Sequence, residues 1–368
     1  MKKIIPLSRP FIGSAERKAV IQILQSGKLA QGEKVAELEN KFKHLCDTSY
    51  AIATNNGTSA LHTALHAVGI KPGDEVITTP FTFIATVNSI LMMGARPVFV
   101  DIDENTYAID PHKIEAAITH KTKAILAVDL YGQPADYDAI NTIAKKYHLP
   151  VIEDAAQSIG ATYKKKQAGN LADISCFSLY ATKNIMCGEG GMITTNNKKY
   201  YKNAHLFRQH GEVEDTRFVY DGLGYNYRMM DLQAGIALAQ FERLDRITNK
   251  RLKIAKKYHQ ELAGISGLVL PYVQKNATHV YHQFTIRITS EFKTTREQFI
   301  AYLGKKGIGV GVYYPAPLHL VPHIARYGYK KDDFPISELA SLQVLSIPVH
   351  PLVSEEEIDY IIDCIKSY

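Results

Sequence analysis

A lysine in a loop rich in small residues is the first candidate for chemistry in this sequence. Lys183 follows the expected buried strand 175–178, and Gly188, Gly190 and Gly191 follow within eight residues of it. A lysine amine becomes a nucleophile when a partly buried, cationic setting lowers its pKa, and it can then form a Schiff base with an aldehyde or ketone. Most lysines are solvated, so the loop alone leaves a surface lysine as an open alternative.

Asp154 is a second candidate, because an apolar strand beginning at residue 151 ends in the carboxylates of Glu153 and Asp154. In an open parallel sheet, ligands bind outside the carboxyl ends of the strands, so a carboxylate at such an end faces a ligand site. It could bind a metal ion, a ribose hydroxyl or a protonated ring nitrogen. Capping of a following helix is an equally open alternative.

A third candidate is the segment 55–61, where an Asn-Asn-Gly-Thr-Ser sequence opens a helical pattern. Free backbone N–H groups, two hydroxyl side chains and the positive end of a helix dipole together suit a phosphate. Many helices that bind nothing also begin with Ser or Thr, so a plain N-cap is the alternative here.

The three candidates together point to one cofactor. Pyridoxal phosphate needs a lysine for its aldehyde, a carboxylate for its pyridine nitrogen and a helix N-terminus for its phosphate. Lys183, Asp154 and Thr58 supply these groups. A dinucleotide site is not favoured, because no G-x-G-x-x-G follows the first strand, and no G-x-x-x-x-G-K-[ST] sequence is present.

The elements that must position these groups follow an α/β pattern. Between residues 50 and 195, short β-branched runs alternate with helical patterns, which indicates a mostly parallel sheet covered by helices. A helix over 135–147 has Asp136 as its expected N-cap, and 162–170 is expected to be a surface hairpin or excursion. The expected strands are 75–78, 97–100, 124–128, 151–153 and 175–178.

A long helical pattern over 230–262 exceeds an ordinary globular helix, so it is expected to bridge two lobes or to be kinked. We place the domain boundary inside it. The prediction is a large cofactor-binding domain, 1–245, with an N-terminal helical segment, and a smaller α+β domain, 246–368. The second domain is expected to contain strands at 281–288 and 309–314 and helices at 295–305 and 354–367.

Composition bounds these expectations. The 368 residues are 46% hydrophobic and 22% charged, an ordinary globular balance that suggests about two domains. No run of about 18 apolar residues occurs, and the apolar start is broken by proline and arginine, so neither a membrane span nor a signal peptide is expected and a cytoplasmic location is the default. Four distant cysteines fit neither a disulfide scaffold nor a metal knuckle. The net charge of +6 comes from scattered basic residues, which does not indicate a nucleic-acid partner.

A series of short motifs covers nearly the whole chain, and together they resemble those of the DegT/DnrJ/EryC1/StrS family of pyridoxal phosphate-dependent sugar aminotransferases. The resemblance implies the aspartate aminotransferase fold (fold type I), with a mostly parallel, mixed seven-stranded sheet between helices and a smaller C-terminal α+β domain. The motifs are 56–61, 75–77 leading to 80–83, 131–133, 153–157, 177–183, 188–191, 224–228 with 232–234, and 314–319.

The resemblance assigns cofactor roles residue by residue. Lys183 would hold the cofactor through a Schiff base, Asp154 would pair with the pyridine nitrogen, and Gln157 would bond the ring hydroxyl. Phe83 would stack on the ring face, with core packing as its alternative. The phosphate would be bound by Gly57, Thr58, Ser59 and Ser178, and by Asn226 from the partner subunit of a homodimer.

Substrate contacts are also implied. Arg228 would bind the carboxylate of the amino donor in bidentate geometry, or else form a structural ion pair. Tyr314 and His319 would contact substrate. Many family members have His-Tyr-Pro where this chain has Tyr313-Tyr314-Pro315, and His319 could equally be a hydrogen-bonded surface histidine.

The implied reaction moves an amino group from an amino acid, L-glutamate in our reading, to a nucleotide-linked 3-keto or 4-keto sugar, for surface polysaccharide or another glycan. One alternative is a sugar dehydratase or aromatising enzyme of the same fold, but the dehydratases of this family replace the lysine with histidine. The other is a non-catalytic regulatory homologue, against which the set of Lys183, Asp154 and Ser178 argues, since folding alone does not require it.

Overall fold

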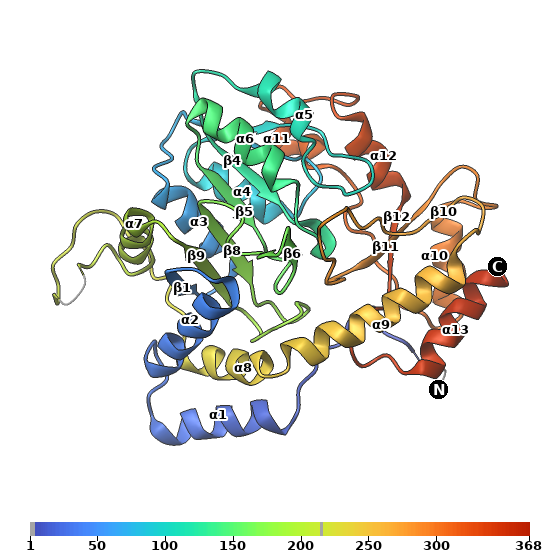
Figure 1. The fold of residues 1–368 in the computed structure, drawn as a ribbon, viewed down its shortest axis with the longest axis horizontal. Helices are drawn as coiled ribbons and strands as arrows, with labels where there is room; N and C mark the ends of the chain where they lie inside the picture. Colours follow the sequence, from blue (N-terminus) through green and yellow to red (C-terminus); the bar gives the residue numbers. More distant parts are fainter. Residues whose placement is uncertain (1–3, 214–215) are drawn as a thin grey trace.

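A seven-stranded sheet forms the centre of the larger part of the molecule (Figure 1), and the computed structural model describes residues 4–213 and 216–368. The strand order is β1-β9-β8-β5-β4-β2-β3, and only β9 runs antiparallel to its neighbours. The expected mixed, mostly parallel sheet is therefore confirmed. The strands are β1 (Tyr50–Thr54), β2 (Glu75–Thr78), β3 (Arg96–Phe99), β4 (Thr122–Val128), β5 (Val151–Asp154), β8 (Ile174–Ser178) and β9 (Gly191–Thr195).

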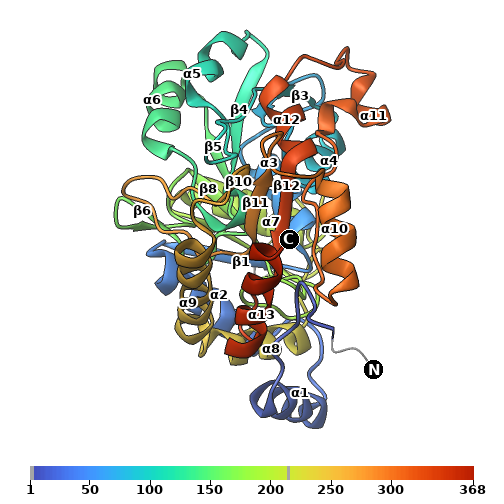
Figure 2. The ribbon, with the colours of Figure 1, turned by 90° about the vertical axis from the view of Figure 1, so that its right-hand side faces the viewer.

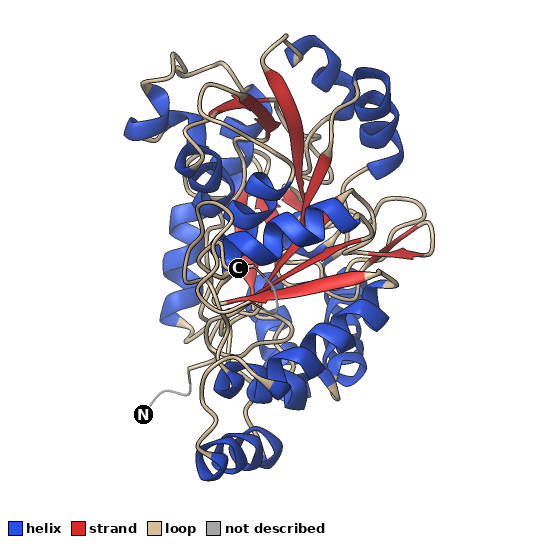
Figure 3. Cartoon of the chain, turned by 90° about the vertical axis from the view of Figure 1, so that its left-hand side faces the viewer, coloured by secondary structure: helices blue, strands red, loops and turns tan. Residues whose placement is uncertain are grey.

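The central strands have apolar side chains on both faces because both faces of the sheet are covered. In β4, Leu126 and Val128 pack into the core on one face, whereas Ile125 and Ala127 pack into the core on the other. Figure 3 shows the strands enclosed between helices. One face is covered by α3 (Gly57–Ala67), α4 (Ile84–Met92) and α7 (Lys198–Arg208), and the other by α2 (Glu33–Cys46), α5 (Pro111–Ile114), α6 (Tyr137–Tyr147) and α8 (Asp231–Phe241).

Local signals in the sequence explain several boundaries. The side chain of Asp136 accepts a hydrogen bond from the Ala139 N–H, as expected for the N-cap of α6. The expected hairpin is formed by β6 (Thr162–Tyr163) and β7 (Lys166–Gln167). At the N-terminus, α1 (Ser14–Ser26) packs against α8. Among the described residues, no helix is both long enough and apolar enough to cross a membrane.

The pattern over 230–262 is divided into two helices. α8 ends at Phe241, and α9 (Leu244–Leu262) continues as a second helix toward the C-terminal part of the chain (Figure 1). α9 buries Ile247, Ile254 and Tyr258 at helical spacing. The domain boundary between residues 245 and 246 would lie in the first turn of α9, and it stays a prediction.

The C-terminal part is built on a small antiparallel sheet of β10 (Leu268–Val269), β11 (Phe284–Ile288) and β12 (Val344–Ile347). Figure 2 shows this sheet beside α9, α10 (Arg296–Lys305) and α13 (Glu355–Lys366). Thr295 and Ser354 cap α10 and α13 through their side chains. Both helices were expected from the sequence.

The predicted strand over 309–314 is wrong. The chain forms only isolated bridges there, from Ile308 to Ile5 and from Gly311 to Ser346. Glycines at 307, 309 and 311 weaken a strand because they add no side chain to pack. The predicted strand over 281–288 begins only at Phe284, since Tyr281 has a positive φ of 46°.

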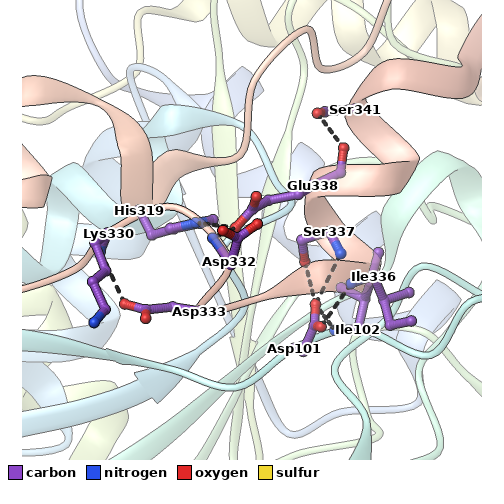
Figure 4. A network of polar contacts seen from close by, with 10 residues as sticks. All are labelled: Asp101, Ile102, His319, Lys330, Asp332, Asp333, Ile336, Ser337, Glu338 and Ser341. Atoms are coloured by element: carbon purple, nitrogen blue, oxygen red, sulfur yellow. Dashed lines mark hydrogen bonds and ion pairs between the residues drawn. The ribbon is translucent and has the colours of Figure 1, made fainter.

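Asp101, a carboxylate of the larger part, fixes the start of a helix in the C-terminal part. Asp101, just after β3, accepts hydrogen bonds from the Ile336 N–H at 3.0 Å, the Ser337 N–H at 3.0 Å and the Ser337 hydroxyl at 2.6 Å (Figure 4). These donors lie in the first turn of α12 (Pro335–Gln343), which follows the short helix α11 (Pro322–Ala325). Asp101 therefore satisfies a helix N-terminus that is more than 230 residues away in sequence.

Asp101→Ala is expected to lower the free energy of unfolding by about 3 kcal/mol, because it removes three charge-assisted hydrogen bonds to α12, and a fourth from the Ile102 N–H, at a buried position. Denaturant unfolding followed by circular dichroism measures the change. The matched control is Glu104→Ala, which removes an exposed carboxylate three residues further on. Equal midpoints for the two variants would contradict the role given to Asp101.

Candidate active site

A cavity of about 810 Å³ lies where the carboxyl ends of the parallel strands meet the C-terminal part. Its lining includes His282, Gln283 and Tyr313 from the C-terminal part, so residues from both parts of the chain form one site. Nine of the twelve residues predicted from sequence line this cavity: Gly57, Thr58, Ser59, Phe83, Asp154, Gln157, Ser178, Lys183 and Tyr314.

The N-terminus of α3 forms one end of the cavity. Asn56 caps the helix by accepting a hydrogen bond from the Ser59 N–H at 2.8 Å. The Ser59 hydroxyl donates to Asn55 at 2.7 Å, so its proton is already used. In the described part of the chain, no hydrogen bond occupies the N–H groups of Gly57 and Thr58. These two groups are available to an anion at the positive end of the helix dipole.

Gly57 shows that this end of the site is built for close approach. A Cβ atom at residue 57 would lie 2.9 Å from the Cβ of Ser178, at the end of β8. The absence of a side chain brings the helix N-terminus and the Ser178 hydroxyl together. Backbone N–H groups and hydroxyls in this arrangement fit the phosphate of pyridoxal phosphate.

Lys183 lies in the loop between β8 and β9. The glycine-rich segment that returns to β9 holds this loop, because the Ala181 N–H donates to the Gly188 carbonyl at 3.0 Å and the Leu179 N–H donates to the Gly190 carbonyl at 2.8 Å. Burial lowers the pKa of the Lys183 amine to about 8, against the opposing charge of Asp154. The lysine is thus closer to its nucleophilic form than an exposed lysine would be.

Asp154 lies at the end of β5 and is buried. Its Oδ2 accepts a hydrogen bond from the Thr86 hydroxyl at 2.8 Å, and its Oδ1 accepts one from the Ala156 N–H at 3.2 Å. Burial raises the pKa of Asp154, whereas both hydrogen bonds and the charge of Lys183 act in the opposite direction. A carboxylate in this setting suits a protonated ring nitrogen as its partner.

The orientation of Gln157 follows from its neighbour. The Tyr131 N–H donates to Gln157 Oε1 at 2.7 Å, and an N–H group can only bond to an acceptor. The Gln157 NH₂ group must therefore face the other way, where it lies 3.4 Å from the Tyr314 hydroxyl. Both Gln157 and Tyr314 line the cavity, so the amide offers a donor to a ring oxygen there.

Phe83 is not part of a core. Its side chain is 54% exposed. Phe83 and Tyr314 both line the cavity, and their ring centres lie 6.1 Å apart. The core-packing alternative for Phe83 is therefore wrong. An exposed ring beside a lysine and a carboxylate offers a flat surface on which an aromatic cofactor can stack.

Asn226 and Arg228 do not line the cavity of their own chain. Asn226 is exposed, and Arg228 is partly buried. Both lie in the connection between α7 and α8, part of which projects away from the body of the molecule at the left of Figure 1. Their predicted roles stay predictions.

His319 also lies outside the cavity lining. Its side chain is fully buried, and its Nε2 lies 3.0 Å from Glu338 Oε1 on α12 (Figure 4). Burial lowers the pKa of the imidazole, although Glu338 opposes this shift. The alternative of a surface histidine is wrong in its location, but the expected hydrogen bond is present. The contact of His319 with substrate stays a prediction.

Several residues of the site were not found from the sequence. Thr86 binds Asp154, and Thr82 lies 3.0 Å from the Thr86 hydroxyl. The only sequence signal was the spacing of the two threonines, one helical turn apart after the Pro80-Phe81 motif. His282 lines the cavity, and its Nδ1 has no hydrogen-bond partner within the described residues. Burial and the charge of Lys183 lower the pKa of His282, which keeps its ring neutral.

Comparison with known proteins finds relatives over nearly the whole chain. The sequence profile of the DegT/DnrJ/EryC1/StrS aminotransferase family matches residues 10–366. A "pleiotropic regulatory protein" of Geobacillus stearothermophilus is 43% identical over 350 residues, covering 94% of this chain and 92% of that protein. The UDP-2-acetamido-2-deoxy-3-oxo-D-glucuronate aminotransferase of Pseudomonas aeruginosa is 40% identical over 341 residues, covering 92% of each.

Among solved structures, the pyridoxal phosphate form of the putative sugar aminotransferase Spr1654 from Streptococcus pneumoniae superimposes with a TM-score of 0.94. The two sequences are 30% identical, and the match covers 99% of this chain and 98% of that one. The expected fold and the expected cofactor are therefore confirmed.

The ligand-free protein is expected to react with pyridoxal phosphate faster as the pH rises, and to level off above about pH 8. At that pH about half of the Lys183 amine is unprotonated, against under about one hundredth for an exposed lysine. Stopped-flow absorbance of the new visible band measures the rate. Lys183→Ala should abolish the band, whereas Lys165→Ala, which removes an exposed lysine, should not. A rate that keeps rising to pH 10 would contradict the lowered pKa.

Proposed function

Because the chain belongs to the DegT/DnrJ/EryC1/StrS aminotransferase family, we propose that it transfers an amino group from L-glutamate to a nucleotide-linked keto sugar. Membership of the family makes it a pyridoxal phosphate-dependent aminotransferase. The donor, the acceptor and the pathway go beyond that statement. The pathway we propose is the synthesis of an amino sugar for surface polysaccharide or another glycan.

The observation that carries the proposal is the meeting of Lys183 and Asp154 in one cavity, with the N-terminus of α3 at its end. Pyridoxal phosphate, when bound, supplies an aldehyde and an electron-accepting ring. Lys183 Nζ would hold the cofactor at its aldehyde carbon, and the same atom would carry a proton to or from the donor Cα. A lysine with a pKa of about 8 can both release and take up this proton near neutral pH.

The other residues of the cavity would hold and orient the cofactor. The Asp154 carboxylate keeps a proton on the ring nitrogen, which favours electron withdrawal from the donor carbon. Gln157 donates to the ring oxygen, and Phe83 stacks on the ring. Gly57, Thr58 and Ser178 bind the phosphate. Ser59 supports them through its hydrogen bonds to Asn55 and Asn56, because its own donors are engaged.

The nature of the acceptor is supported by the P. aeruginosa relative, whose name specifies a UDP-linked 3-oxo sugar. The cavity of about 810 Å³ is larger than a cofactor of this size requires, which leaves room for a sugar. Tyr313 and Tyr314 line the cavity from the C-terminal part, and we propose Tyr314 as a substrate contact. The test below includes acceptors with the keto group at C3 and acceptors with it at C4.

A regulatory role is the second candidate function, and the name of the G. stearothermophilus relative favours it. A regulator that does not turn over substrate has no need for a lysine of lowered pKa beside a buried carboxylate. The dehydratase alternative conflicts with Lys183, because the dehydratases of the family have histidine at that position. We therefore place transamination first.

The test is a panel of nucleotide-linked 3-keto and 4-keto sugars, each incubated with holoenzyme and glutamate and followed by release of 2-oxoglutarate. At least one sugar should support turnover, and Lys183→Ala should reduce the rate by about 10³-fold or more. Bleaching of the cofactor by glutamate without use of any sugar would reject the acceptor class. Near-normal turnover by Lys183→Ala would reject the lysine assignment.

We also propose that the active unit is a homodimer with shared sites. The segment 216–230 exposes large apolar side chains, among them Phe218 (71% exposed) and Leu223 (70% exposed). Such side chains on a projecting segment favour burial against another protein surface. Asn226 and Arg228 lie on the same segment, so a second copy could bring them to the phosphate and the donor carboxylate.

A cytoplasmic location likewise stays a prediction.

Mixing two inactive variants tests the shared site. In a hybrid of Lys183→Ala and Asn226→Ala subunits, one of the two sites would combine an intact Lys183 with an intact Asn226. The mixture, after exchange of subunits, should recover about one quarter of wild-type activity, since about half of the dimers are hybrids. The control is each variant alone. Activity no higher than the average of the separate variants would show that both residues serve the same subunit's site.

A further inference from the structure

A short chain of hydroxyl groups ends on the Asp154 carboxylate. The Thr86 hydroxyl lies 2.8 Å from Asp154 Oδ2, and the Thr82 hydroxyl lies 3.0 Å from the Thr86 hydroxyl. All three side chains are buried, and all three line the cavity. Thr86 lies in the first turn of α4, and Thr82 lies just before the helix begins.

The direction of this chain follows from the number of protons available. A hydroxyl has one proton, and Thr86 donates its proton to Asp154. Thr86 can therefore only accept from Thr82, so Thr82 donates to Thr86 and Thr86 donates to Asp154. Each donor polarises the next hydrogen bond toward the carboxylate.

The arrangement leaves Asp154 with a defined orientation. Oδ1 accepts from the Ala156 N–H and Oδ2 accepts from Thr86, so each oxygen is held by one donor from a different element. A carboxylate with only the Ala156 contact could rotate about its terminal torsion, which is a soft degree of freedom. The contact with Thr86 removes that freedom.

We propose that Thr86, itself fixed by Thr82, is a positioning residue that holds the Asp154 carboxylate against the ring nitrogen of the cofactor. The inference rests on the proposed role of Asp154. Thr86 need not touch the cofactor itself. It acts through Asp154 by orienting the carboxylate. Its hydroxyl also supplies a hydrogen bond in place of the water molecules that the carboxylate loses on burial.

The experiment measures the affinity of the ligand-free protein for pyridoxal phosphate by fluorescence titration. Thr86→Val keeps the shape of the side chain but removes the hydroxyl, and it should weaken binding by about tenfold or more. Thr86→Ser restores the hydroxyl and should bring the affinity back to within about threefold of wild type. Thr82→Val removes only the more distant hydroxyl and should have a smaller effect than Thr86→Val.

A matched control separates the hydrogen bond from the loss of a buried hydroxyl. Thr63 on α3 is fully buried, and its hydroxyl has no hydrogen-bond partner among the residues that the structure describes. Thr63→Val should therefore leave the affinity for the cofactor unchanged. Urea unfolding of every variant shows that the titrated proteins are folded.

A cofactor analogue supplies the decisive comparison. In 1-deazapyridoxal phosphate, carbon replaces the ring nitrogen, so the group that Asp154 is proposed to face is absent. Thr86→Val should then bind the analogue as well as the wild-type protein does. An equal loss of affinity for both ligands, or no loss for pyridoxal phosphate, would overturn the inference. Asp154→Asn distinguishes the two possible failures. If this variant also binds pyridoxal phosphate normally, the proposed role of Asp154 fails, and the positioning role of Thr86 fails with it.

Discussion

The burial of a carboxylate at the end of a parallel strand is the constraint on which this site depends. An isolated charge removed from water is costly, so it must be surrounded by donors and by an opposite charge. For Asp154 these are the Thr86 hydroxyl, the Ala156 N–H and the nearby amine of Lys183. The same burial that raises the pKa of Asp154 lowers that of Lys183, so one environment moves both groups toward neutrality. A cationic ring between them is the partner that such a pair lacks.

The topology of the sheet explains why these groups meet. The parallel strands β5 and β8 end at the same edge of the sheet, so Asp154 and Ser178 lie near each other. The segment that joins the two strands contains only the β6–β7 hairpin. β9 runs back from that edge, and a side chain at Gly191 would overlap the carbonyl oxygen of Asn56. Glycine at 191 therefore allows the returning strand to pass beside the start of α3. The glycine-rich motif therefore serves the geometry of the site.

The parts of the fold predicted from sequence depend on local patterns. Short β-branched runs identified β2, β4 and β5, and the predicted helix starts at Asp136, Thr295 and Ser354 coincide with side-chain caps. What the sequence did not reveal depends on distant partners. Thr86 meets Asp154 across 68 residues. Likewise, His319 meets Glu338 on α12, a helix whose first turn donates hydrogen bonds to the distant Asp101.

Tyr131 joins the cofactor side of the site to the C-terminal part. Its N–H orients Gln157, its carbonyl accepts a hydrogen bond from the Gln283 N–H at 3.2 Å, and its hydroxyl contacts the Tyr313 carbonyl. Gly132 follows with a positive φ of 114°, and a Cβ there would lie 2.9 Å from the His282 nitrogen. The 131–132 turn thus depends on close backbone approach between the two parts. Tyr131 therefore connects Gln157 and Tyr313, which line the cavity from the two parts of the chain.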